Sequence, residues 1–119
     1  MHVATVSEEP PLEELAALLE DETARRILTE IYRKPMSANS LTERCDASEP
    51  TVYRRLEDMR RCGLLVERTR PDTERGHHYT EYATNLERIV VEIDDDGIDF
   101  RVDRRERMAD RFTRLVEEM

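Results

Sequence analysis

Several residue types that support particular functions are scarce in this chain. Its 119 residues include no tryptophan, three glycines and two cysteines. The glycines all stand at expected turn or cap positions, so no glycine-rich phosphate loop is present. Cys45 and Cys62 lack Cys-x-x-Cys spacing and fall in the apolar register of two neighbouring helices. We therefore expect two small buried hydrophobic side chains rather than a disulfide or a redox pair.

Long apolar runs are missing as well. No stretch of 18 apolar residues occurs, and residues 1–11 lack the basic and apolar regions of a signal peptide. We therefore expect a cytoplasmic protein without a membrane span. Neither a nucleophile with its base nor paired carboxylates in a pocket can be recognised, so we expect no enzyme activity and no cofactor. The acidic run 94–96 lacks the spaced ligands of a calcium loop and is interpreted as a charged turn.

Acidic residues are in excess, and Lys34 is the only lysine in a chain of net charge −9. This composition resembles that of proteins from salt-accumulating halophiles, in which surface acidity serves solubility and says little about partners. Residues 1–47 carry 5 basic and 10 acidic groups, and residues 80–119 carry 7 and 12. Residues 48–79 carry 7 and 6, so the least acidic third is the part best suited to bind nucleic acid.

The stretch 48–65, SEPTVYRRLEDMRRCGLL, predicts a short amphipathic helix. Ser48 is a suitable N-cap, and Gly63 supplies the C-terminal stop. Val52, Leu56 and Met59 recur at i, i+4 and i+7, which places them on one stripe that faces a core. The opposite surface carries groups that can address base edges and phosphates: Pro50, Tyr53, Arg54, Glu57 and Arg61.

The segments on either side complete a recognisable motif. Residues 37–45 predict a second short helix capped by Ser37, and the brief turn at 46–47 makes the two helices a helix-turn-helix. Residues 64–70 and 77–84 predict antiparallel strands joined by a polar tip, which together form a wing.

The remaining segments frame this motif. Residues 1–11 have no periodic pattern and are expected to form a flexible arm. Residues 12–19 predict a helix with a broad apolar face, and residues 21–34 predict the scaffold helix of the core. Residues 35–37 are long enough for a strand residue or two that could pair with the wing.

Apolar residues alternate on both sides of the Asp-Gly turn signal at 96–97, from Leu86 to Val102. This pattern predicts a β-hairpin with one buried face. A short helix over 85–93 remains possible, although the β-branched residues favour strands.

The end of the chain carries Met108, Phe112, Leu115 and Met119 at spacings of four, three and four. Such a stripe predicts a helix that must be buried, and we expect a twin subunit to cover it. The predicted homodimer interface comprises Leu12, Leu15, Leu19, Met108, Phe112, Leu115, Val116 and Met119. The expected fold is α+β, a winged helix-turn-helix over residues 12–84 with an added hairpin and dimerisation helix over 85–119.

The block 18–84 resembles the ArsR-like winged helix-turn-helix transcriptional regulators. The likeness is most specific in DETARRIL, in SEPTVYRRLEDMRRCGLL and in HHYTEYA. It implies a dimeric regulator that binds specific sequences of double-stranded DNA, with its recognition helix in the major groove and its wing on the backbone or minor groove. The segment after Thr84 resembles an addition found in regulators from halophilic archaea.

One feature of metal-sensing relatives is missing. Where those regulators carry Cys-x-Cys, this chain has Ser37 and Asn39, and its histidines, His2, His77 and His78, lie elsewhere. Neighbouring strand residues point to opposite faces, so His77 and His78 are poorly placed to ligate one ion. We therefore expect no metal site.

The expected DNA contacts are Ser48, Pro50, Thr51, Tyr53, Arg54, Glu57, Arg61, Arg68, Arg70, Arg75 and His77. The alternative function is a winged-helix module that contacts another protein through Tyr53 and Arg54 and does not bind DNA. A DNA reader is expected to carry its arginines on one continuous positive strip, formed by Arg54, Arg61, Arg68, Arg70 and Arg75. A protein adaptor need not have such a strip.

Overall fold

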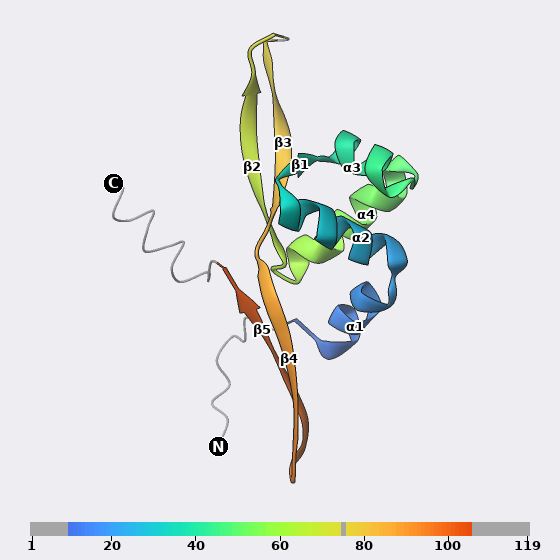
Figure 1. Cartoon of the computed structure of the whole chain (residues 1–119), viewed down its shortest axis with the longest axis vertical. Coiled ribbons are helices and arrows are strands. Elements are labelled where there is room, and N and C mark those ends of the chain that lie inside the picture. Colours follow the sequence, from blue (N-terminus) through green and yellow to red (C-terminus); the bar gives the residue numbers. More distant parts are fainter. Residues whose placement is uncertain (1–9, 75, 106–119) are drawn as a thin grey trace, which may run out of the picture.

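A computed structural model describes residues 10–74 and 76–105. Within these ranges the chain forms four helices and antiparallel strands in two small sheets, which confirms the predicted α+β winged helix-turn-helix. The helices lie to one side, and two hairpins extend from them in opposite directions (Figure 1). The predicted C-terminal helix and most of the predicted arm lie outside the described residues. No helix in the described ranges is long and apolar enough to cross a membrane.

The described chain opens with α1 (Leu12–Glu20) and α2 (Glu22–Arg33). Asp21 stands between them and accepts a hydrogen bond from the backbone N–H of Ala24 at 2.7 Å, so it caps α2. The apolar stripe of α2 is buried, with Ile27 at 0% exposure. This confirms α2 as the scaffold helix of the core.

The helix-turn-helix follows as β1 (Met36–Ser37), α3 (Ala38–Cys45) and α4 (Glu49–Arg61). Asp46 adopts a left-handed conformation in the turn, with φ at 49°. Ser48 caps α4 as predicted, because its side chain accepts the backbone N–H of Thr51.

The wing consists of β2 (Leu65–Asp72) and β3 (His77–Thr84). Its sheet has the order β1-β3-β2, and Met36 pairs with Tyr82, which confirms the short strand predicted before α3. The strands run further than predicted: Pro71 is still paired, opposite His78, so the tip is shorter than residues 71–76.

The second hairpin consists of β4 (Leu86–Asp94) and β5 (Gly97–Arg104). The strand interpretation of residues 85–93 is therefore correct, and the helical alternative is wrong. The expectation of one buried face holds only at the base, where Val102 is 6% exposed. Towards the tip, Val91 and Ile98 are 61% and 66% exposed, because no described element covers them.

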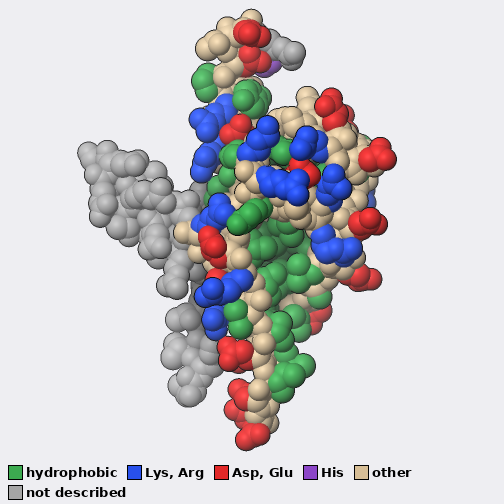
Figure 2. Space-filling view, viewed as in Figure 1, with side chains coloured by type: hydrophobic (Ala, Val, Ile, Leu, Met, Phe, Trp, Pro, Cys, Tyr) green, Lys and Arg blue, Asp and Glu red, His purple; other side chains and the backbone are tan. Residues whose placement is uncertain are grey.

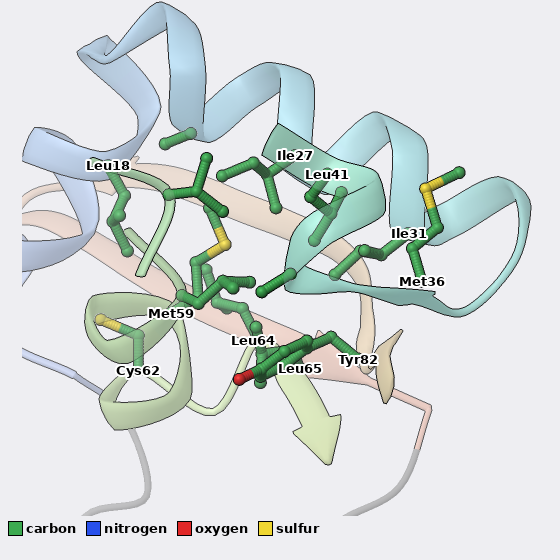
Figure 3. Close-up of a cluster of buried hydrophobic side chains, with 14 of the residues drawn as sticks. Leu18, Ile27, Ile31, Met36, Leu41, Met59, Cys62, Leu64, Leu65 and Tyr82 are labelled. Carbon is green, nitrogen blue, oxygen red and sulfur yellow. The ribbon is translucent and has the colours of Figure 1, made fainter. Parts of the chain in front are cut away.

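The core lies where the helices meet the start of the wing (Figure 3). Leu18, Ile27, Leu41 and Met59 point into it from the four helices, and Leu64 closes it from the loop after α4. The buried stripe of α4 is therefore held against every other helix of the domain.

Candidate nucleic-acid interface

Helix α4 has one buried face and one exposed face. Val52, Leu56 and Met59 are at most 2% exposed, so they fix the helix on the core. Tyr53 lies off this stripe and is 48% exposed, and Arg54 beside it is also exposed. Within the described part of the chain, the side chain of Arg54 forms neither an ion pair nor a hydrogen bond. Its guanidinium group is available to a guanine edge or a phosphate.

The N-terminus of α4 adds polar groups beside Arg54. The hydroxyl of Ser48 accepts the backbone N–H of Thr51 at 3.3 Å and donates to the hydroxyl of Thr51 at 2.8 Å. Ser48 and Pro50 are exposed, and Thr51 is half-buried. A helix N-terminus carries positive dipole charge and suits a phosphate oxygen. The structure thus brings five of the predicted contacts together at one end of α4: Ser48, Pro50, Thr51, Tyr53 and Arg54.

Two further predicted contacts on α4 are engaged in ion pairs within the helix. Glu57 accepts a hydrogen bond from Arg60 Nε at 3.0 Å, and this bond lowers the pKa of Glu57. Arg61 pairs with Asp58 and borders a cavity of about 280 Å³ between α1 and α4. The sequence reasoning missed Arg60, although its spacing of three residues from Glu57 is the signal for such a pair.

The wing arginines Arg68 and Arg70 lie on the sheet face that adjoins the end of α2. Arg68 lines a cavity of about 320 Å³ together with Tyr32 and Arg105. Alternate residues of a strand share a face, so Arg70 lies on the same side as Arg68, where it pairs with Glu81 at 3.1 Å. Arg61 thus lies beside α1 and Arg68 beside the end of α2. The continuous strip that joins these arginines to Arg54 stays a prediction.

The wing tip holds the last two predicted contacts. His77 is exposed at the first position of β3, opposite Asp72 in the ladder. Arg75 lies outside the described residues. The role of the tip in binding DNA stays a prediction.

An ion pair joins α4 to the start of α2. Arg55 donates from Nε and Nη2 to the two carboxylate oxygens of Asp21, at 2.9 and 3.1 Å. Both side chains are largely covered, with 24% of Arg55 and 28% of Asp21 exposed. The hydrogen bonds from Arg55 lower the pKa of Asp21. A two-point contact of this kind fixes the rotation of α4 relative to the scaffold helix.

A buried carboxylate joins the scaffold helix to α3. Glu30 is 1% exposed and accepts hydrogen bonds from Arg44 Nε at 2.7 Å and from Arg26 Nε at 3.2 Å. The bond from Arg44 is the main cause that lowers the pKa of Glu30. Sequence reasoning missed this contact and the Asp21–Arg55 pair, since each joins residues of different helices.

The C-terminus of α4 is bound by the second hairpin. Gly63 ends the helix with φ at +70°, and Arg104 of β5 donates to the carbonyl oxygens of Gly63 and Cys62 at 3.0 and 2.9 Å. The side chain of Asn85 donates to the carbonyl of Gly63 at 3.3 Å, and its backbone N–H donates to that of Leu64 at 2.9 Å. Carbonyl groups that a helix end leaves unpaired are thereby satisfied. The second hairpin is thus attached directly to the end of α4.

The predicted dimer contacts on α1 differ in accessibility. Leu15 is 1% exposed and packs within the core described above. Leu12 and Leu19 are exposed on the surface of the same helix. Of the predicted α1 contacts, these two remain accessible to a second subunit. The other predicted contacts, Met108, Phe112, Leu115, Val116 and Met119, lie outside the described residues.

Both cysteines are free thiols that pack against the core. Cys62 is buried and Cys45 is half-buried. Burial is the largest cause that raises the pKa of each thiol, so little reactive thiolate forms near neutral pH.

We expect the Cys45→Ala, Cys62→Ala double variant to respond to oxidant as the wild type does. Its free energy of unfolding should fall by about 1 kcal/mol, since only small core contacts are removed. DNA binding before and after diamide treatment, with thermal unfolding alongside, measures both effects. A loss of DNA binding on oxidation that disappears in the variant would instead identify a thiol switch.

Ser37 and Asn39, the positions compared above with the Cys-x-Cys of metal-sensing regulators, lie at the start of α3. Ser37 caps α3, because its hydroxyl accepts the backbone N–H of Ser40 at 3.2 Å. Asn39 is exposed in the first turn of that helix. Over residues 10–74 and 76–105, no group of three or more His, Cys, Asp or Glu side chains is placed to hold a metal ion.

Comparison with known families supports the helix-turn-helix assignment. Residues 18–68 match the model of a family described as a helix-turn-helix domain. The match spans α2, β1, α3 and α4 and ends inside β2, so β3 and the second hairpin lie outside it. A search of curated proteins finds no match to the chain. The match agrees with the helix-turn-helix that α3 and α4 form, and it points to a DNA-binding regulator.

Proposed function

We propose that this protein is a sequence-specific transcriptional regulator of the ArsR-like type that binds double-stranded DNA as a homodimer. In this proposal α4 enters the major groove and the wing meets the backbone or minor groove. The protein acts in the cytoplasm of a salt-accumulating archaeon and is not an enzyme. The acidic, lysine-poor composition supports the halophilic setting.

The observation that carries the proposal is the exposed N-terminal end of α4. Tyr53 and Arg54 lie there side by side in the sequence, both exposed, and Arg54 has no partner in the described part of the chain. The helix itself is fixed by its buried stripe, by Asp21 and by Arg104. Residues near the start of a recognition helix are those that reach base edges, and a fixed helix presents them without a large ordering cost.

Arg54→Ala is expected to flatten sequence preference. A guanidinium group that forks onto guanine contributes about 1–3 kcal/mol of discrimination, so the preference for a cognate duplex over a scrambled one should fall by roughly that amount. Binding constants for both duplexes, measured by fluorescence anisotropy across a salt series, test this effect. The cognate duplex would first be identified by mapping bound genomic sites in native salt.

Arg88→Ala is the control, because Arg88 is an exposed arginine on β4 of the second hairpin and is not among the predicted DNA contacts. It should leave the cognate-to-scrambled ratio unchanged. Equal loss of discrimination in both variants would mean that Arg54 acts only through net charge. Failure of the wild type to bind any duplex at any salt concentration would remove the DNA-reader proposal.

The alternative, a module that contacts proteins, is favoured by one observation. Glu57 and Asp58 on α4 are partly exposed carboxylates, and Arg61 and Arg68 lie beside different helices. If the wild type binds no DNA, Tyr53 and Arg54 become the predicted contact for a protein partner.

A further inference from the structure

The second hairpin carries an apolar surface with an unusual gradient of exposure. Three cross-strand pairs of apolar residues stack along one of its faces. These six residues, here called the hairpin ladder, are Ile89 opposite Val102, Val91 opposite Phe100, and Ile93 opposite Ile98. Val102 is 6% exposed at the base, whereas Ile93 is 77% exposed near the tip. The inner end belongs to the domain core, and the outer end is open to solvent.

The exposed apolar residues of the hairpin ladder indicate that a partner covers them. A two-stranded ribbon cannot bury its own apolar face, and contiguous exposed apolar residues are typical of interaction sites. Figure 2 shows hydrophobic side chains reaching down this end of the molecule, with acidic side chains gathered at the tip. Because Ile89, Phe100 and Val102 already pack against the core, a segment laid on the ladder would extend that core outward.

The acidic residues around the hairpin ladder indicate the charge that a bound segment should carry. Residues 91–99 contain five carboxylates and no basic residue: Glu92, Asp94, Asp95, Asp96 and Asp99. A segment that fits should combine an apolar stripe with arginines or lysines beside it.

The chain itself contains such a segment in residues 106–119. Its sequence carries Met108, Phe112 and Leu115, and an arginine directly precedes each of them. The 14 residues would span about 21 Å as a helix, and the ladder from Ile89 to Ile93 is about 13 Å long. The segment is thus long enough to cover every pair of the ladder.

The course of the chain favours a second copy as the source of this segment. Strand β5 runs from the tip at Gly97 to the base at Arg104, so the chain leaves the described part heading away from the exposed end of the ladder. Arg105 is held there: its guanidinium lies 5.1 Å from the ring centre of Tyr32 and pairs with Glu87 at 2.9 Å. To cover its own ladder, the chain would have to reverse immediately after this anchored residue.

We propose that the hairpin ladder is the seat for residues 106–119 of a second copy of this chain, in a two-fold exchange between subunits. This inference rests on the homodimer in the proposed function and names the surfaces that form it. A two-fold axis makes the contact reciprocal, so each copy supplies one ladder and one apolar segment. Because Arg104 and Asn85 join the hairpin to the end of α4, the same contact sets the distance between the two recognition helices.

The test uses full-length chains with a charge placed on either side of the seat. The ladder variant carries Ile93→Glu and Ile98→Glu, and both residues are too exposed to be needed for folding of the subunit. The segment variant carries Phe112→Glu. The control is Val90→Glu, which puts the same charge on the opposite face of β4, across from Arg101. Light scattering in high salt, without DNA, gives the mass, and circular dichroism checks that each variant is folded.

The wild type and the control should be dimers, and each of the other two variants should be a monomer at the same concentration. An equimolar mixture of the ladder and segment variants should regain a dimer population, since one intact ladder meets one intact segment. A dimeric ladder variant, a monomeric wild type or a monomeric control would overturn the proposal. If the mixture stays monomeric, residues 106–119 are not exchanged between copies. The segment would then contact the hairpin ladder of its own chain.

This test of dimerisation can fail independently of the DNA-binding proposal, because it is carried out without DNA. If the wild type binds DNA and the ladder variant is still a dimer, this inference alone is rejected. A wild type that dimerises through the ladder but binds no DNA would reject the DNA-binding function alone.

Discussion

Gly63→Ala is expected to lower the free energy of unfolding by about 3–4 kcal/mol, for two separate reasons. Gly63 has φ at +70°, where a side chain costs about 1–2 kcal/mol. An added Cβ would also lie 2.8 Å from Arg104 Nε. Arg104 can move aside, but it then gives up its hydrogen bonds to the carbonyl groups of Cys62 and Gly63, at about 1 kcal/mol each.

Substitution of a second glycine separates the backbone cost from the loss of the Arg104 hydrogen bonds. Gly76 has nearly the same conformation, with φ at +72°, and nothing lies within 4 Å of the Cβ it would gain. Gly76→Ala should therefore show the backbone cost alone, and the excess in Gly63→Ala should measure the lost cap. Denaturant unfolding of both variants, and of each combined with Arg104→Ala, gives the values. If the excess persists when Arg104 is already alanine, the cap is not its cause.

Asp21→Ala is expected to destabilise the domain by about 2 kcal/mol, because the residue has two structural roles. As the N-cap of α2, its loss should cost about 1 kcal/mol. The two-point pair with Arg55, largely covered on both sides, should contribute about 1 kcal/mol more. Asp21→Asn keeps an acceptor for the cap and removes the charge, so it should show mainly the second part.

The stability of the wild type relative to Asp21→Asn should decrease as the pH falls. The bonds from Arg55 hold the pKa of Asp21 in the folded state below its ordinary value of 3.8. The unfolded chain therefore takes up the proton first as the pH falls. The stability that Asp21 provides over Asn should be complete above about pH 5 and should fade below 3.8, as the folded carboxylate becomes protonated. Thermal unfolding of both proteins from pH 7 to pH 3 tests this; a constant difference would contradict an ionic role.

Local features of the sequence determined the elements that carry the candidate interface. The cap at Ser48, the stop at Gly63 and the spacing of Val52, Leu56 and Met59 defined α4, because capping and helical periodicity act within a few residues. The same features place Tyr53 and Arg54 off the buried stripe near the start of the helix. Alternation around the Asp-Gly turn likewise defined β4 and β5.

Only the tertiary structure decided what those elements touch. Arg55 meets Asp21 and Arg104 meets Gly63 across separations of 34 and 41 residues, and no local pattern marks such pairs. Arg61 and Arg68 are both exposed, but Arg61 borders a cavity beside α1 and Arg68 borders one beside the end of α2. Alternation shows which residues of the second hairpin share a face. Whether that face is covered depends on the elements packed against it, and in this fold they reach only its base.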